Sequence, residues 1–500
     1  AICIFKFVAS LRNHLKKSDY FKAIGGIFLK YKWTVLTVTT IGMLMFGINS
    51  RIVIVGLPQV AAALNADAEQ AIWFTQAYVF ASTVALFLVG RAADIFGRVK
   101  IYVLGFALFT IGALLSGLSS NPVQVIIFRG LQGFGGGIIS TIGITMIVDA
   151  TPPCDLGFFL GLNQSAFRLG AMLGLTLSGV LLALLDWRAL FLINVPIGIF
   201  GTLWASRRLK EVVRVEKRSP IDWGGFITIS AAMASLLLAL TFAAYGMAHH
   251  NAVLLLLIIF AVVMFFFFIH ESRIDYPLFD LSLLRIREFL GGNLAQLLNA
   301  AAWGAVLLLL SLYLQLVLGL SPVEAGVRLI PFEITYFVVG VISGRLSDKY
   351  GCLPFTTSGL AVTSLSLFLF STMDAQTPYQ TVVGYMLVFG IGMGVFASPN
   401  VSSIMGCVPL KRKGIGSAFR TTMFNVGYLM SLSLAVLLMS LTIPYDLLTQ
   451  IITSIDPISI SMSDRQLLVE AMQKTYLGLA VLNTLAIVPS VLRGRGNRDR

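Results

Sequence analysis

Two short charged stretches decide the fold: residues 90–98 read GRAADIFGR, and residues 344–351 read GRLSDKYG. Each follows a long apolar stretch and places glycines, which permit tight turns, beside a small set of charges. A turn of this kind that recurs at matching places in a chain indicates an internal duplication. The sequence therefore predicts two related halves, each with this turn after its second helix.

About 14 apolar stretches surround the two turns, each long enough to cross a bilayer as a helix. Six come first, at 33–57, 71–91, 99–119, 123–148, 156–184 and 188–206. Two lie in the middle, at 223–245 and 251–270, and six follow, at 289–313, 322–344, 352–372, 379–404, 413–441 and 475–492. The pattern predicts an all-α integral membrane fold, with two six-helix bundles and two extra central helices.

Composition agrees with a chain that faces lipid. Soluble proteins carry about 25% charged residues, whereas this chain carries 12% and is 57% hydrophobic. Helices satisfy their own backbone hydrogen bonds and so tolerate a bilayer. The formal charge of +13 is attributed to cytoplasmic loops rather than to nucleic acid. We expect no metal site, because the four cysteines form no CxxC pair.

The distribution of Lys and Arg predicts the orientation. With the N-terminus inside, the inner segments hold 28 of the 36 Lys and Arg residues, the outer segments hold four, and four fall within spans. Such a bias is typical of cytoplasmic loops. We expect both termini in the cytoplasm and the chain in the cell (plasma) membrane. The expected regions are a cytoplasmic amphipathic segment (1–32), a first bundle (33–210), a linker with two extra helices (211–272) and a second bundle (273–500).

These segments resemble the major facilitator superfamily, and specifically its 14-span drug:proton antiporter branch. The first turn matches the family pattern G-x-L-a-D-r-x-G-r-k through Gly90, Asp94, Gly97, Arg98 and Lys100. The second turn repeats it through a matching set: Gly344, Arg345, Asp348 and Gly351. The resemblance implies that these turns latch the two halves in one state of a transport cycle.

Two further motifs carry the resemblance. Residues 129–135 read RGLQGFG, and the family gives Arg129 a part in proton coupling; the alternative is an anchor at the inner face. The fifth span keeps the glycines of the antiporter pattern at Gly161, Gly170, Gly174 and Gly179. Leu175 replaces its proline, which weakens the inference of export and leaves generic small-residue packing as the alternative.

The first span departs from the family. Residues 48–58 read INSRIVIVGLP, so that Asn49 replaces an acid and Arg51 replaces a threonine. Four arginines, at 51, 129, 168 and 420, face one clear acid within the spans, Glu333. We therefore hypothesise that an anionic or zwitterionic amphiphile is tolerated. The alternative for Arg51 is that it merely reaches the outer interface.

Glu333 is the leading candidate for the proton-carrying group, because a buried carboxyl can hold a proton at neutral pH. The alternative is a helix-to-helix ion pair with one of the arginines. Residues expected to line a substrate cavity are polar, cationic or aromatic: Asn49, Arg51, Tyr78, Gln132, Arg168, Trp303, Gln315, Arg420 and Asn425. Aromatic residues at such depths also form interface belts.

The expected function is alternating-access export of an amphipathic, drug-like compound, driven by protons moving inward. The expected partners are thus a small molecule, protons and the lipid bilayer, with no obligate protein partner and no cofactor. No G-x-x-x-x-G-K-[ST] motif occurs, so this chain is not expected to be driven by ATP, and no catalytic constellation suggests an enzyme. Three alternatives stay open: an uptake permease, a lipid flippase, and a transport-dead sensor or scaffold.

Overall fold

The computed structural model describes residues 18–152, 155–211, 222–244, 249–274, 277–279, 281–409, 413–453 and 462–494. Over these ranges the chain contains helices and no strands. Residues 1–17 of the expected amphipathic segment lie outside them. From Ser18 the chain is already helical and continues without a break into the first span.

Two groups of helices, separated along the chain by a central pair, make up the fold. The first group is α2 (Ser18–Leu64), α3 (Ala68–Phe96), α4 (Arg98–Gly117), α5 (Pro122–Ala150), α6 (Leu156–Leu184), α7 (Ala189–Leu192) and α8 (Asn194–Arg208). The central pair is α9 (Trp223–Ala244) and α10 (His250–Arg273). The last group is η3 (Leu281–Arg285), α11 (Arg287–Trp303), α12 (Val306–Leu312), η4 (Tyr313–Val317), α13 (Pro322–Arg328), α14 (Ile330–Tyr350), α15 (Cys352–Phe370), α16 (Tyr379–Gly406), α17 (Lys413–Ser440), α18 (Tyr445–Thr453), α19 (Met462–Leu485) and α20 (Ile487–Leu492).

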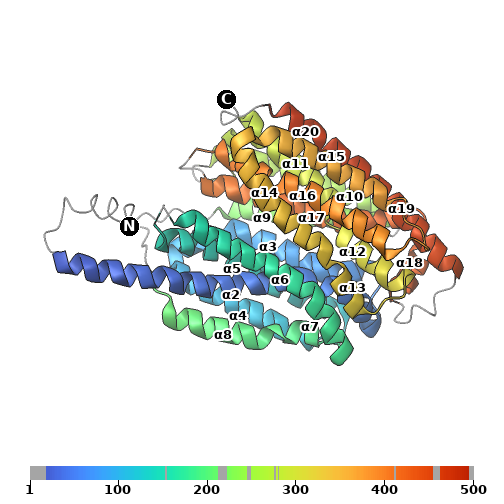
Figure 1. Cartoon of the computed structure of the whole chain (residues 1–500), viewed down its shortest axis with the longest axis horizontal. Helices are drawn as coiled ribbons and strands as arrows, with labels where there is room; N and C mark the ends of the chain where they lie inside the picture. The colour runs from blue at the N-terminus through green and yellow to red at the C-terminus, as the bar shows by residue number, and fades with distance from the viewer. Residues whose placement is uncertain are drawn as a thin grey trace.

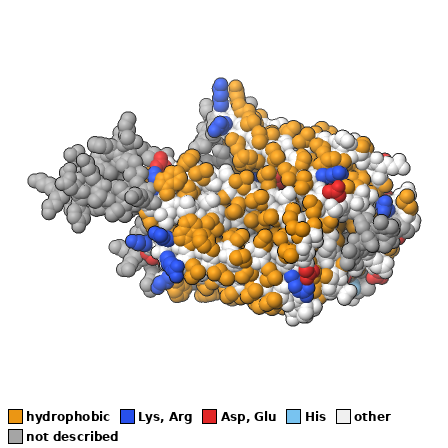
Figure 2. Space-filling view, turned by 60° about the horizontal axis from the view of Figure 1, so that its bottom comes forward, with side chains coloured by type: hydrophobic (Ala, Val, Ile, Leu, Met, Phe, Trp, Pro, Cys, Tyr) orange, Lys and Arg blue, Asp and Glu red, His pale blue; other side chains and the backbone are white. Residues whose placement is uncertain are grey.

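Figure 1 shows the first group and the last group as two bundles lying side by side. Within the described residues, 14 helices are long and apolar enough to cross a membrane, as the sequence predicted. Apolar side chains cover the middle of the face in Figure 2, and Lys and Arg gather toward its ends. Such a surface is suited to lipid rather than to water.

The two charged turns have the same backbone geometry, which supports the predicted duplication. Gly97 ends α3 with φ +103°, and Gly351 ends α14 with φ +87°. Both conformations are strained for residues with a Cβ atom. The N–H of each glycine donates to the carbonyl four residues earlier, over 2.9 Å and 3.0 Å. We call the end of the molecule that carries these glycines the turn end.

The two bundles are joined at the opposite end, which we call the sealed end (residues 55–68, 315–326 and 445–449). Gln315 of η4 donates to the Val55 carbonyl of α2 over 3.0 Å. The backbone N–H of Glu69 donates to the Tyr445 hydroxyl of α18 over 3.0 Å. No hydrogen bond between two described residues crosses from bundle to bundle at the turn end. The structure therefore shows a state that is closed at the sealed end.

The ninth and tenth spans are interrupted where the sequence suggested continuous helices. α11 ends at Trp303, and the Ala305 N–H beyond the break donates to Ser431 of α17 over 2.9 Å. The tenth span divides at Leu329 into α13 and α14, and Pro331 lies in the first turn of α14. A proline is tolerated there because its missing N–H has no partner to lose.

Close backbone contact between α2 and α6 depends on the predicted glycines. A Cβ atom at Gly170 would meet the Leu44 carbonyl, and one at Gly174 would meet the Ile48 carbonyl. Gly179 lies against Pro322 and Val323 of the other bundle, so it belongs to the seal. A Cβ atom at Gly161 would meet nothing within 4 Å, so that glycine makes no close contact.

We predict that Gly174→Ala lowers the stability of the folded protein by about 1–3 kcal/mol, because a new methyl group would meet backbone that cannot move aside. Gly161→Ala is the matched control on the same helix. It is expected to leave stability unchanged or to raise it by up to about 1 kcal/mol, because alanine favours helix. Thermal unfolding of the purified variants in detergent would measure both. Equal melting temperatures for the two variants would contradict the assignment.

Candidate functional site

An ion pair between the two bundles forms the centre of the candidate site. Nε of Arg51 in α2 lies 3.7 Å from Oε1 of Glu333, in the first turn of α14. Both side chains are at least nine-tenths buried. Arg51 therefore faces the interior and does not reach the interface, which decides between the two interpretations of its position. Glu333 has an arginine partner, and this is compatible with its also carrying a proton.

Aromatic rings surround the ion pair. The Arg51 guanidinium lies 5.4 Å from the ring centre of Trp303 and 5.9 Å from that of Tyr428. Its Nη1 also donates to the Tyr428 hydroxyl over 3.3 Å. Cations over aromatic faces are stabilised, more so when water is excluded. The site thus combines fixed charge with flat apolar surface, as an amphipathic ligand requires.

A second arginine, Arg168, also makes contacts from the first bundle to the second. Nη2 of Arg168 in α6 donates to the Tyr336 hydroxyl of α14 over 2.9 Å, and the guanidinium lies 4.0 Å from the Tyr336 ring centre. Arg168 also interacts electrostatically with Glu333. Tyr336 was not singled out from the sequence, although it lies three residues after Glu333 and so shares its helix face.

Three buried polar atoms at this centre have no hydrogen-bond partner among the described residues: Nε of Arg51, Oε1 of Glu333 and Nε1 of Trp303. Buried polar atoms are normally partnered. These three atoms belong to α2, α14 and α11, respectively, and Trp303 is the last residue of α11, just before the break in that span. Nε of Arg51 and Oε1 of Glu333 face each other in the ion pair without a hydrogen bond, so all three atoms have hydrogen-bonding capacity that a ligand could use.

Arg129 lies in a separate network inside the first bundle. Its Nε donates to the Phe74 carbonyl over 2.9 Å and its Nη1 to Gln132 over 2.7 Å. Gln132 donates to Asn49 over 2.9 Å, and the guanidinium lies 4.3 Å from the Tyr78 ring centre. Arg129 is fully buried, and none of its hydrogen bonds with described residues is to an acid. Arg129 is therefore held in place by neutral groups that include Asn49, Tyr78 and Gln132.

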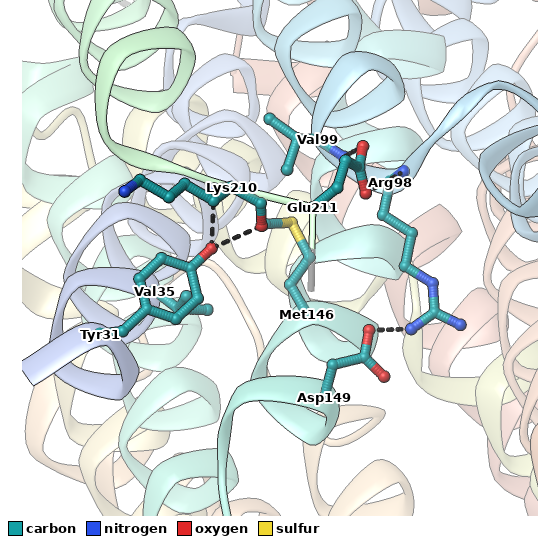
Figure 3. A pocket seen from close by; sticks show the side chains of 8 residues that line it. All are labelled: Tyr31, Val35, Arg98, Val99, Met146, Asp149, Lys210 and Glu211. Atoms are coloured by element: carbon teal, nitrogen blue, oxygen red, sulfur yellow. Dashed lines mark hydrogen bonds and ion pairs between the residues drawn. The ribbon is translucent and has the colours of Figure 1, made fainter. Parts of the chain in front are cut away.

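Ion pairs and hydrogen bonds hold the first charged turn to neighbouring helices and to the segment after α8, and Figure 3 shows several of the residues involved. Arg98 pairs with Asp149 of α5 and, over 3.4 Å, with Asp94. Glu211 accepts from the backbone N–H groups of Arg98 and Val99 over 3.2 and 2.8 Å, at the start of α4. A carboxylate suits a helix N-terminus because the N–H groups there are positive. Glu211 was not anticipated from the sequence.

A small pocket lies beside these contacts, and Tyr31 and Arg98 are among the residues that line it. The Tyr31 hydroxyl donates to the Lys210 carbonyl over 2.7 Å and accepts from the Lys210 N–H over 2.8 Å. The segment after α8 is thus tied to both α2 and α4. Among the described residues, the side-chain partners of Arg98 belong to the first bundle, so the cross-bundle role of this turn stays a prediction.

The remaining predicted residues have varied surroundings. Lys100 and Arg345 are exposed, and the side chain of Asp348 is outside the described set. A Cβ atom at Gly90 would be in open space, and one at Gly344 would meet Ser398.

Two predicted cavity residues, Arg420 and Asn425, are partly exposed on α17, and Arg420 interacts electrostatically with Tyr336. Gln315 belongs to the seal, where it donates to the Val55 carbonyl and accepts from Gln59. Within the part of the chain that the structure describes, no cluster of His, Cys, Asp and Glu is suited to a metal ion.

Buried acids outside the central site were missed in the sequence. Asp222 and Glu271 meet at the start of α9, where Gly225 packs against both carboxyl groups. Burial opposes ionisation of Asp222, but hydrogen bonds with the Gly225 N–H and with His270 outweigh it and keep the pKa of Asp222 below its usual value. Glu69, at the start of α3, is wholly buried. The sequence signal for Glu69 is weak, because one acid beside a helix start normally remains in water.

The fold and the interface between its bundles define a membrane transporter built from two related halves. The profile of the Major Facilitator Superfamily matches residues 39–291 and 292–453. The chain belongs to this superfamily, as its motifs predicted, and it is a transporter rather than an enzyme.

Similar proteins of known name include transporters of several compounds. The riboflavin transporter RibZ of Clostridioides difficile is 28% identical over 80% of this chain and 86% of its own. The multidrug transporter MdtP of Bacillus subtilis is 28% identical over 72% and 66%. The tetracenomycin C resistance and export protein of Streptomyces glaucescens is 27% identical over 79% and 73%.

Solved structures support the fold. A bacterial homologue of the human lysosomal transporter Spinster, in an inward-facing and unoccupied conformation, superposes with a TM-score of 0.64 at 14% identity, over 93% of this chain and 97% of its own. The xylose transporter XylE from E. coli gives 0.60 at 14% identity, over 92% and 97%.

We predict that Arg129→Lys lowers stability as well as transport. Lysine cannot reproduce the forked donors or the stacking on Tyr78, and the loss is expected to cost about 1–3 kcal/mol. Arg420→Lys, at a partly exposed arginine, is the matched control and should unfold like the wild type. An Arg129→Lys variant with wild-type melting temperature and no transport would show that Arg129 acts in transport without supporting the fold.

Proposed function

We propose that this transporter moves drug-like, amphipathic compounds across the cell membrane by alternating access, coupled to protons carried on Glu333. The observation that carries the proposal is the Arg51–Glu333 ion pair, which joins the two bundles at their centre. If Glu333 is paired with Arg51 in one conformation and unpaired in another, the two conformations differ in their affinity for a proton on Glu333. Proton binding then shifts the equilibrium between the two conformations. The relative named as a tetracenomycin C resistance and export protein supports export as the direction.

Proton coupling follows from the chemistry of the pair. When Glu333 is ionised, it neutralises Arg51. When Glu333 takes a proton, the attraction is lost and Arg51 is left as an uncompensated cation beside Trp303 and Tyr428. A buried charge without a partner is costly, so protonation favours either separation of the bundles or a new partner for Arg51.

The charge of the substrate decides the direction of coupling. A cationic compound would bind to the ionised carboxylate of Glu333, so it would compete with the proton and be exchanged for it. An anionic compound would bind to Arg51 when Glu333 is protonated, so it would move together with the proton. Two observations support the second case: Arg51 and Arg168 outnumber Glu333, and Asn49 stands in place of an acid. Proton-linked uptake of an anionic amphiphile is therefore the second candidate function.

We assign the turn end and both termini to the cytoplasm, from the bias of Lys and Arg in the sequence. The state described here is then closed on the outer side.

We predict that Glu333→Gln lowers substrate-dependent proton movement at least tenfold, because the amide can neither bind nor release the proton. Proteoliposomes loaded with a pH-sensitive dye, with candidate compounds added under a pH gradient, would measure this. Glu324→Gln is the matched control, since Glu324 is an exposed acid of the same span that caps α13 and glutamine also fits that cap. Unchanged proton movement in Glu333→Gln would place the proton elsewhere.

We predict opposite proton signals for two amphiphiles of matched shape and opposite charge. Entry of the cation should drive protons out of the vesicle, whereas entry of the anion should carry protons in. Arg51→Gln should abolish the signal of the anion and spare that of the cation. Identical signals for both compounds would contradict the role of the ion pair, and no signal for any compound would favour the flippase or transport-dead alternatives.

A further inference from the structure

A second buried acid lies far from the central ion pair, in the seal between the bundles. Glu69 is in the first turn of α3, with 0% of its surface exposed. Neither of its carboxyl oxygens has a hydrogen-bond partner among the described residues. An ionised carboxylate in such surroundings is very costly. The closed state therefore holds Glu69 as a neutral acid.

Among the described residues, no cation interacts electrostatically with Glu69. The hydroxyl of Thr241 in α9 lies beside the carboxyl group and accepts from Trp73 Nε1 over 3.1 Å. Asp67, which is also negative, interacts electrostatically with Glu69. His249 and His250 begin α10 at this end, but His249 stacks on Phe242 and His250 is exposed. A second negative charge at Glu69 would be repelled by Asp67.

Glu69 lies where opening of the seal would expose it. Its own N–H donates to Tyr445 of α18, and the Ala68 N–H donates to Thr449 over 3.2 Å. Tyr445 in turn donates to Asp67 over 3.2 Å. These contacts join α3 of the first bundle to α18 of the second. When they break, α18 withdraws from the start of α3 and water reaches the carboxyl group.

We propose that Glu69 is a second proton-binding residue, which takes up a proton when the sealed end closes and releases it when that end opens. In water a glutamic acid ionises near its ordinary pKa of about 4.3, so the open state favours the carboxylate at neutral pH. Closing this end therefore consumes a proton, and a rise in pH favours opening. The linkage differs from the role proposed for Glu333, because it acts through Glu69 at the sealed end and is tested without substrate.

The test measures the separation of the bundles at the sealed end as a function of pH. Ala63 and Gln376 are exposed residues of the two bundles at this end and would be replaced by cysteine for spin labelling. The four native cysteines would first be changed to serine. Distance distributions of the full chain in nanodiscs, without substrate, give the ratio of open to closed molecules.

In the wild-type background this ratio should rise with pH, by up to about tenfold per pH unit for one linked proton. Glu69→Gln mimics the neutral acid and should stay closed, with less than about a twofold change between about pH 5.5 and pH 8.5. Glu69→Met is a second neutral replacement and should also lose the pH dependence. It keeps the test decisive if the Glu69→Gln variant fails to fold. Asp446→Asn, at an exposed acid of α18, is the matched control and should titrate like the wild type.

The proposal is overturned if Glu69→Gln titrates like the wild type, or if the wild type shows no pH dependence. It is also overturned if Asp446→Asn alone removes the dependence, because the linked proton would then lie elsewhere. Substrate-driven proton movement is measured separately in proteoliposomes, so failure of the proposed function and failure of this proposal are distinguishable.

Discussion

Charge inside an apolar molecule must be partnered, and this constraint organises the whole transporter. Water cannot stabilise the buried guanidinium groups of Arg51 and Arg129, so each gathers partners from several helices. Arg129 finds neutral acceptors and an aromatic ring within one bundle. Arg51 finds its carboxylate across the interface. The first arrangement is complete and holds helices together, whereas the second is incomplete and joins parts that must move.

The central site is suited to transport because Arg51 and Glu333 are paired without a hydrogen bond between their facing atoms. A distance of 3.7 Å between Arg51 and Glu333 leaves polar atoms that a ligand can bind. Buried pairs of this kind are weak contributors to stability, because desolvation offsets the attraction. A weak pair can be broken by one proton or replaced by a charged ligand. The aromatic rings around it supply apolar surface with little selectivity for shape.

The seal adds a second place where proton binding and movement can be linked. α18 closes over the start of α3 and covers Glu69, and α9 of the central pair covers it from another side through Thr241. The extra helices thus contact the seal as well as the lipid. Protons bound at the centre and at the seal would respond to different events, since one depends on a ligand and the other on opening.

Sequence alone was sufficient for much of the fold. The apolar stretches gave the 14 spans because length and hydropathy are local properties. The two charged turns predicted the duplication and the family, and their glycines do adopt matching positive φ angles. Gly170, Gly174 and Gly179 were identified as points of close approach, and the backbone contacts agree. The residues expected to line one cavity separate into a bundle network, a central cluster and the seal, and their role in binding stays a prediction.

Only the tertiary structure decided which charges meet. Arg51 and Tyr428 are 377 residues apart, and Gln315 and Val55 are 260 residues apart, so no local pattern reveals these contacts. The breaks in the ninth and tenth spans arise from packing against α17 and from Pro331, and they place Trp303 and Glu333 at the centre. The sequence by itself determined a two-bundle membrane transporter, because hydropathy and turn motifs are properties of short, continuous segments. Burial of Glu69 and pairing of Glu333 depend on helices from opposite bundles meeting, and that is a property of the folded molecule.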